Sequence, residues 1–171
     1  VRAVRLGQPV KVRENLRLAT VDAQMENHPL RRDLTEHLEL NDKLARRISG
    51  MKGKEKGLAH RELNRGWKEV RRIEGQMRDD ILNRAQVLCC TCIGAGHVLL
   101  DGRRFSRVLL DEATQATEPA SLVPLVRGAR QIVLVGDHRQ LPPTVISQRA
   151  EKGGLRRSLF ERLAKMGIEP M

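Results

Sequence analysis

Two segments with the same layout decide the fold: Val108-Leu109-Leu110-Asp111-Glu112 and Ile132-Val133-Leu134-Val135-Gly136-Asp137. In each, a short continuous apolar run is followed at once by a polar or glycine-bearing turn, which is typical of strands buried on both faces of a parallel sheet. Between them, residues 118–128 can form a helix, because Pro119 can begin it and Gly128 can end it. Strand, helix and strand predict a right-handed parallel crossover and an α/β fold.

Further strands and a last helix extend this pattern outward. Residues 87–90 form another apolar run, and residues 1–6 alternate apolar and polar side chains, so both segments predict short strands. The three cysteines, Cys89, Cys90 and Cys92, alternate between strand faces and have no second pair of ligands, so we expect small buried side chains and no zinc site. Apolar side chains at three- and four-residue steps predict a last helix over about 155–166.

Residues 28–84 show the period of helices. Two apolar stripes predict two antiparallel helices, with Trp67 in the core of the second. The stripes consist of Leu30, Leu34, Leu38, Leu44, Ile48 and Met51, then Leu63, Trp67, Val70, Ile73, Met77 and Ile81. Between them, residues 50–57 form a glycine-punctuated turn carrying Lys52, Lys54 and Lys56, and these lysines either contact phosphate or simply face solvent.

The composition favours an anionic partner. The chain of 171 residues has 32 Lys and Arg against 21 Asp and Glu, a net charge of +11, and 40% hydrophobic residues. This balance fits a packed domain that binds nucleic acid, an acidic protein or an anionic membrane face. No run approaches the ~18 apolar residues that span a bilayer.

The ends of the two central strands carry the chemistry. An Asp such as Asp111, directly after a buried strand, can hold Mg²⁺ directly or through water, and Glu112 can orient or deprotonate an attacking water. Gly136 permits a sharp turn, so Asp137 and Gln140 project into the same crevice. The strand ends therefore predict a phosphate-hydrolysing site.

Several ordered motifs resemble those of superfamily 1 helicases. Residues 111–115 (Asp-Glu-Ala-Thr-Gln) resemble motif II, residues 136–143 (Gly-Asp-His-Arg-Gln-Leu-Pro-Pro) motif III, residues 89–96 motif Ic, and residues 5–9 the motif Ib region. Residues 158–163 (Ser-Leu-Phe-Glu-Arg-Leu) add to the resemblance, which points to the branch containing the nonsense-mediated-decay and immunoglobulin mu-binding helicases.

The resemblance implies an architecture. Residues 1–27 and 85–171 would form part of a RecA-like P-loop domain with a parallel sheet, and residues 28–84 an inserted antiparallel helical hairpin. The chain contains no Gly-x-x-x-x-Gly-Lys-Ser/Thr loop, which the family would place before Val1, and a second RecA-like domain would follow Met171. We therefore expect the chain to be an internal part of a longer motor, with those missing parts as its partners.

The resemblance also implies roles for individual residues, with ATP and Mg²⁺ as cofactors. Asp111 would coordinate Mg²⁺, Glu112 would activate the hydrolytic water and Gln140 would sense the γ-phosphate. Asp137, next to Gly136, would couple the nucleotide site to the strand-binding surface, and Gln115 would bridge motif II to its neighbours. Single-stranded RNA or DNA would lie along a set of loop residues: Arg5, Gly7, Pro9, Thr91 and Gly94. Thr91 has a second interpretation, in which its hydroxyl only bonds its own turn.

Two main functions remain open, together with a weaker third. The first is an ATP-dependent helicase, a nucleoside triphosphatase whose hydrolysis drives translocation on single-stranded nucleic acid in the full-length parent. The second is a catalytically inactive nucleic-acid-binding module. A non-helicase P-loop ATPase is disfavoured by the Gly-Asp-x-x-Gln-Leu-Pro-Pro sequence after the second central strand. We expect a cytoplasmic or nuclear protein; the residues do not distinguish these locations, RNA from DNA, or the direction of translocation.

Overall fold

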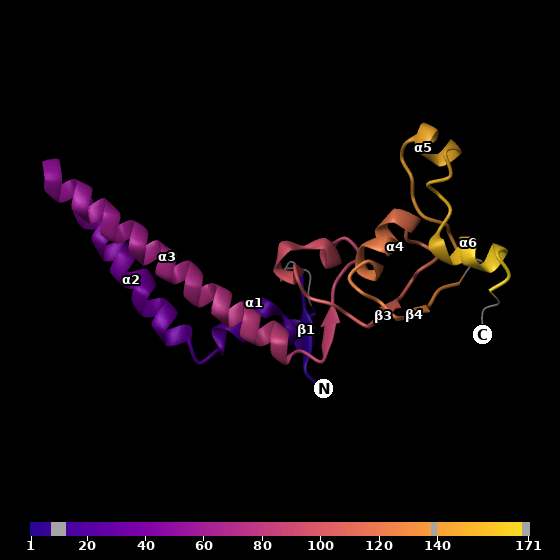
Figure 1. Cartoon of the computed structure of the whole chain (residues 1–171), viewed down its shortest axis with the longest axis horizontal. Helices are drawn as coiled ribbons and strands as arrows, with labels where there is room; N and C mark the ends of the chain where they lie inside the picture. Colours follow the sequence, from indigo (N-terminus) through magenta and orange to yellow (C-terminus); the bar gives the residue numbers. More distant parts are fainter. Residues whose placement is uncertain (8–12, 138–139, 169–171) are drawn as a thin grey trace. The chain divides into compact units, whose positions relative to one another are not determined.

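The computed structural model describes residues 1–7, 13–137 and 140–168 and forms two compact units, Val1–Cys89 and Cys90–Met171 (Figure 1). Each unit contains one pair of parallel strands together with helices. The chain is therefore an α/β protein, as the apolar runs predicted, and its short parallel sheets are consistent with part of a RecA-like domain. Within the described ranges, no helix is both long and apolar enough to cross a membrane.

The first unit begins with a small parallel sheet. Strand β1 (Ala3–Arg5) pairs with β2 (Val87–Cys89), so that segments from opposite ends of the unit lie side by side. A 3-10 helix, η2 (Glu14–Ala19), and helix α1 (Val21–Glu26) follow β1. The Thr20 hydroxyl caps α1 by accepting a hydrogen bond from the Ala23 amide at 3.2 Å.

A helical hairpin forms the rest of this unit. Helices α2 (Arg31–Ile48) and α3 (Gly53–Arg84) pack side by side and run in opposite directions (Figure 1). Their shared core contains Leu34, Val70, Ile73 and Met77, which confirms the two predicted stripes except for Trp67. The connecting turn is shorter than residues 50–57, because α3 already begins at Gly53 and continues through Gly57. Tertiary packing of a long helix outweighs the weak helix propensity of one glycine.

One close crossing sets the spacing of the hairpin. A Cβ on Gly66 would lie 1.8 Å from Oδ1 of Asn41, which is itself buried on α2. Only glycine therefore lets the helices approach this closely. The adjacent Trp67 was expected in the core but is 38% exposed, because one residue further along the helix is a rotation of about 100° away from the contact line.

In the second unit, the predicted strand–helix–strand arrangement is confirmed. Strand β3 (Arg107–Leu110) and strand β4 (Gln131–Leu134) pair in parallel, and helix α4 (Glu118–Leu125) connects them. Pro119 lies in the first turn of α4, as expected from its fixed φ and missing amide hydrogen. Two 3-10 helices, η3 (Gly94–Gly96) and η4 (Val98–Leu100), precede β3.

Two short helices follow β4, where the sequence predicted a single helix over 155–166. Helix α5 (Gln148–Lys152) was not expected, and α6 (Leu159–Lys165) begins later than predicted. The reason for the late start is a cap: the Ser158 hydroxyl accepts a hydrogen bond from the Glu161 amide at 3.1 Å.

The expectation of strands buried on both faces was wrong. In β3 only Leu110 is buried, whereas Leu109 is 65% exposed and Val133 of β4 is 53% exposed. Each described sheet has two strands, so both are edge strands, and the exposed Leu109 and Val133 show that one face is left open by the described residues. Burial on both faces requires layers on each side of a sheet.

The prediction that the three cysteines are small buried side chains was also wrong. Cys89 and Cys90 are exposed and Cys92 is half-buried, so these side chains are not small core residues. Cys89 ends the edge strand β2, where little packs against it. Among the residues that the structure describes, no group of three His, Cys, Asp or Glu side chains is placed to hold a metal ion.

The compact units do not follow the expected division of the chain. Residues 1–27 pack with the hairpin in the unit that ends at Cys89. The division into residues 1–27 and 85–171 against residues 28–84 describes the architecture of the helicase family. It stays a prediction.

Candidate functional site

The ends of β3 and β4 are joined by backbone hydrogen bonds that continue beyond the strands. The Val135 amide donates to the Leu110 carbonyl, and the Ala113 amide donates to the Val135 carbonyl, each at 2.8 Å. These two bonds hold the turn after β3 against the turn after β4. The two segments that the sequence identified as chemical are therefore neighbours.

The paired carboxylates lie on the first of these turns. Asp111 and Glu112 are both exposed, and the Glu112 amide donates to Oδ1 of Asp111 at 3.0 Å. Glu112 has a φ of 52°, in the left-handed region that a non-glycine residue rarely adopts. This conformation gives the two adjacent carboxylates different directions. Such local strain is common at functional sites.

One glutamine side chain connects the two turns. The Gln115 amide nitrogen, Nε2, donates to Oε2 of Glu112 at 3.1 Å and approaches Oε1 of Gln140 at 3.5 Å. The structure thus brings together three of the residues that the sequence analysis selected. Pro143 is buried just beyond Gln140, which fits a stiff exit from the turn.

Gly136 allows the second turn to approach closely. A Cβ at this position would lie 3.1 Å from the backbone nitrogen and from both Cγ2 and Oγ1 of Thr114. Asp137 follows and is exposed, and its carbonyl accepts the Gln140 amide at 3.1 Å. The sequence analysis did not single out Thr114, and only its position within motif II pointed toward it.

The residues present fit a hydrated Mg²⁺ ion, since this ion is held by one or two carboxylates together with waters and phosphate oxygens. Asp111 and Glu112 supply exposed carboxylate oxygens at a strand end. The phosphate-cradling loop of P-loop proteins is not among the 171 residues, so the residues present could hold the metal ion of such a site but not cradle its phosphates.

A bidentate ion pair anchors the helix that follows the carboxylates. Nε of Arg162, on α6, donates to both carboxylate oxygens of Glu118, on α4, at 2.9 Å. The hydrogen bonds from Arg162 hold the pKa of Glu118 below its ordinary value of 4.5. The same pairing raises the pKa of Arg162. The sequence analysis missed this pair, because its members are 44 residues apart.

The loop residues expected along nucleic acid lie in two units: Arg5 and Gly7 belong to the first, and Thr91 and Gly94 to the second. In the second unit, Oγ1 of Thr91 accepts the Gly94 amide at 3.0 Å, so the hydroxyl bonds its own turn as the second interpretation held. A hydroxyl that accepts one hydrogen bond can still donate another. In the first unit, Gly7 follows β1 with a φ of 131°, and the Arg5 guanidinium packs beside it. Pro9 lies outside the described residues.

The three lysines at the hairpin tip are exposed. Lys52 precedes α3, whereas Lys54 and Lys56 lie on the helix itself. Three further exposed basic residues, Arg61, Arg65 and Lys68, follow Lys54 at steps of seven, four and three residues. These steps place them on one face of α3, which we call the basic stripe: Lys54, Arg61, Arg65 and Lys68.

The basic stripe differs from the basic residues of α2. Ion pairs to carboxylates one turn away neutralise Arg32, Lys43 and Arg46. Within the described ranges, no member of the stripe makes such an ion pair. The sequence analysis missed the stripe, although its spacing could have been found from the helical period.

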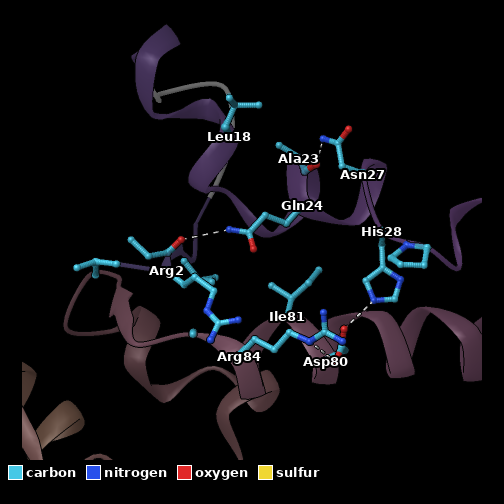
Figure 2. Close-up of a pocket in the computed structure, with 14 residues that line it drawn as sticks. Arg2, Leu18, Ala23, Gln24, Asn27, His28, Asp80, Ile81 and Arg84 are labelled. Carbon is cyan, nitrogen blue, oxygen red and sulfur yellow. Dashed lines mark hydrogen bonds and ion pairs between the residues drawn. The ribbon is translucent and has the colours of Figure 1, made fainter.

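The first unit also has an open pocket, beside β1, α1 and the end of α3 (Figure 2). Asp80 is central to it: Oδ2 lies 3.1 Å from Nε2 of His28, and Oδ1 lies 2.9 Å from Nε of Arg84. Nδ1 of His28 accepts the Leu30 amide at 3.1 Å. The groups around Asp80 therefore already bind one another and hold the start of α2 to the end of α3.

Comparison with known proteins identifies the family of this chain. The AAA domain family matches residues 1–148. The ATP-dependent helicase NAM7 of Saccharomyces cerevisiae is 51% identical over 104 residues, which cover 61% of this chain and 10% of NAM7. The regulator of nonsense transcripts 1 homolog of Arabidopsis thaliana is 48% identical over 104 residues, or 61% of this chain and 8% of that protein.

An uncharacterized ATP-dependent helicase of Methanocaldococcus jannaschii is 32% identical across 96% of this chain and 30% of its own length. The chain thus spans about a tenth of the length of the first two relatives. These relatives confirm the resemblance to superfamily 1 helicases of the nonsense-mediated-decay branch. The chain belongs to the AAA domain family.

Proposed function

We propose that this chain supplies the hydrolytic side of an ATP-dependent helicase motor that moves on single-stranded RNA or DNA. Helicase relatives support the reaction, and the strand-end geometry supports the assignment of residues. Because the chain spans about a tenth of the first relatives, the complete activity belongs to the full-length protein that carries it. Residues of a phosphate cradle and a second motor domain complete the site there.

One observation carries this proposal: the Gln115 side chain lies within 3.5 Å of both Glu112 and Gln140. A carboxylate from one strand end and an amide from the next therefore face a common point. A carboxylate that activates water and an amide that contacts phosphate have to lie close together in a phosphate-hydrolysing site, and this contact supports that placement.

Each residue has a distinct task in the proposed reaction. Mg²⁺ bound to ATP supplies charge neutralisation of the phosphates. Asp111 would hold that cation, directly or through water, and Glu112 would accept a proton from the attacking water. Gln140 donates its amide hydrogens toward the γ-phosphate, and Asp137, on the same turn, transmits the change to the strand-binding surface.

Substitution of Glu112 by Gln tests the hydrolytic role. The change keeps the shape of the side chain and removes the base, so nucleotide binding should persist while ATP turnover falls by about 10²–10⁴-fold. Glu151→Gln is the matched control, because Glu151 lies on the separate helix α5 and its carboxylate pairs with Arg156. Turnover by Glu112→Gln within a few-fold of wild type would refute the assignment.

We further propose that the hairpin contacts the phosphates of single-stranded nucleic acid through its tip lysines and the basic stripe. The net charge of +11 and exposed, unneutralised cations support this. Phosphate contacts carry no sequence information, and only two Phe and one Trp are available for base stacking. Binding should therefore be independent of sequence and strongly dependent on salt.

Salt titrations of charge variants test this surface. Three proteins, each lacking three positive charges, are compared by fluorescence anisotropy with labelled oligo-U and oligo-dT. They carry Gln at the tip lysines (Lys52, Lys54, Lys56), at the three stripe residues beyond the tip (Arg61, Arg65, Lys68) or at the paired cations of α2 (Arg32, Lys43, Arg46).

A group that touches phosphate should lower the slope of log affinity against log salt by up to about two units, since each contact contributes about −0.7. The α2 variant should change it least. Equal changes of slope in all three variants would show that binding depends on net charge alone. An unchanged slope in the tip variant would show that the tip lysines face solvent and do not contact phosphate.

The alternative function is a catalytically inactive nucleic-acid-binding module. An ATPase assay of the purified 171-residue chain tests how the proposed site is divided between this chain and the rest of the protein. Without a phosphate cradle the chain should show no Mg-ATP hydrolysis above background, and saturable hydrolysis that Asp111→Ala abolishes would contradict our division of the site. Full-length protein that binds oligonucleotides but never hydrolyses ATP would favour the binding module. We propose a cytoplasmic or nuclear location, which imaging of the tagged full-length protein tests.

A further inference from the structure

One polar group beside the candidate site has no hydrogen-bond partner. Thr114 is 5% exposed, and its Oγ1 is buried without a partner. Two other buried hydroxyls of the same unit are paired: Ser121 donates to the Thr117 carbonyl at 3.3 Å, and Ser158 accepts the Glu161 amide at 3.1 Å. An unpaired buried hydroxyl opposes folding, whereas a valine of the same shape would not. The Thr114 hydroxyl therefore requires an explanation other than the stability of this conformation.

The hydroxyl lies at the seam between the two strand-end turns. The amide of Ala113, the preceding residue, is fixed to the Val135 carbonyl at 2.8 Å. A Cβ on Gly136 would lie 3.1 Å from Oγ1 of Thr114, so no side chain separates the hydroxyl from the backbone of the second turn. The backbone of Gly136, in the turn after β4, therefore lies directly beside the hydroxyl.

A second contact between these two turns, from Gln115 to Gln140, is long. The distance from Nε2 of Gln115 to Oε1 of Gln140 is 3.5 Å, the long limit of a hydrogen bond. Hydrogen bonds in active sites are often long without substrate and shorten when substrate binds. A similar shortening would bring the Gly136 backbone, which already lies against Thr114, closer to the Thr114 hydroxyl.

We propose that Thr114 is a positioning residue of this site. Its hydroxyl donates a hydrogen bond to the backbone of Gly136 when bound nucleotide draws the turns after β3 and β4 together. The bond keeps Glu112 and Gln140 aligned during hydrolysis, and Thr114 itself does not touch the nucleotide. This inference rests on the proposed ATPase function and assigns a role to a residue that the proposed reaction does not otherwise use.

The test uses three variants of the full-length protein: Thr114→Val, Thr114→Ser and Ser121→Ala. Thr114→Val should melt at or above the temperature of the wild type, because it removes an unpaired buried hydroxyl. Its kcat for ATP should fall about tenfold with KM unchanged, as expected for one hydrogen bond formed only on closure. Thr114→Ser should keep the wild-type kcat. Ser121→Ala should lower the melting temperature and leave kcat unchanged.

Two results would overturn the inference alone. A wild-type kcat in Thr114→Val would show that hydrolysis does not use the hydroxyl. A fall in both kcat and melting temperature in that variant would show a structural role, such as holding a buried water. Wild-type protein without ATP hydrolysis would overturn the proposed function together with the inference.

Discussion

The helical hairpin and the strand-end site differ in the interactions that stabilise them. The hairpin buries its own apolar stripes, with Met77 at 0% and Leu34 at 2% exposure. Strands β3 and β4 leave Leu109 and Val133 more than half exposed. Packing between neighbouring helices stabilises the first region, whereas a few backbone bonds and side-chain contacts shape the second. Substitutions in the hairpin should therefore change stability, and substitutions at the strand ends should change turnover.

Apart from the loss of the Glu112 base, the largest effect should follow from breaking the contact between the two strand ends. Gln115→Leu removes the amide that contacts Glu112 and Gln140 but keeps a side chain of similar size on an exposed position. Loss of alignment at reacting groups can cost about 10²-fold, so kcat of the full-length protein should fall by up to that factor. Its melting temperature should stay within a degree or two of wild type, since the side chain is exposed.

The control for this variant is Gln148→Leu, an exposed glutamine of α5. Steady-state ATPase assays and thermal unfolding of both variants give the comparison. A large loss of stability in Gln115→Leu would mean that the strand-end site depends on packing as much as the hairpin does.

The hairpin should respond to Gly66→Ala in the opposite way. The new methyl group collides with the buried Asn41 amide, so the free energy of unfolding should fall by about 1–3 kcal/mol. Gly75→Ala is the matched control on the same helix, since nothing lies within 4 Å of its Cβ position. That change should raise the free energy of unfolding by up to about 1 kcal/mol through helix propensity. Denaturant titrations measure both.

A double substitution sharpens the same test. Asn41→Ala removes the amide that the methyl group meets, and its Nδ2 has no hydrogen-bond partner to lose. The pair Asn41→Ala with Gly66→Ala should therefore recover most of the stability lost in Gly66→Ala alone. Additive losses would show that the helices do not cross at these two residues.

The smallest effect concerns acid stability in the second unit. The paired Arg162 lowers the pKa of Glu118 below 4.5, so the pair stabilises the folded state above pH 4.5. This contribution should disappear as the pH falls through the lower, folded-state pKa. The difference in melting temperature between wild type and Glu118→Gln should shrink between about pH 5 and pH 3. We expect a modest difference, because the two side chains are 24% and 34% exposed.

Arg162→Gln serves as the partner control and should show the same dependence on pH. Thermal unfolding at constant ionic strength measures the three proteins. A difference that stays constant across this range would show that titration of Glu118 does not contribute.

The sequence by itself determined the order and type of the main elements. Apolar runs located β3 and β4, and a 3.6-residue period located α2 and α3, because these signals come from neighbours in the chain. The chemistry of Asp111, Glu112 and Gln140 was readable too, since polar residues directly after strands gather at one edge of a parallel sheet.

Only the tertiary structure decided which distant groups meet. The contact of Asn41 with Gly66, the pairing of Glu118 with Arg162 and the unpaired hydroxyl of Thr114 depend on segments far apart in the chain. The sequence also could not predict that Leu109 is exposed, because an apolar run indicates a face that can be buried and does not show what covers it. Local periodicity arises from steric rules within a few residues, whereas burial and hydrogen-bond pairing depend on how whole elements pack.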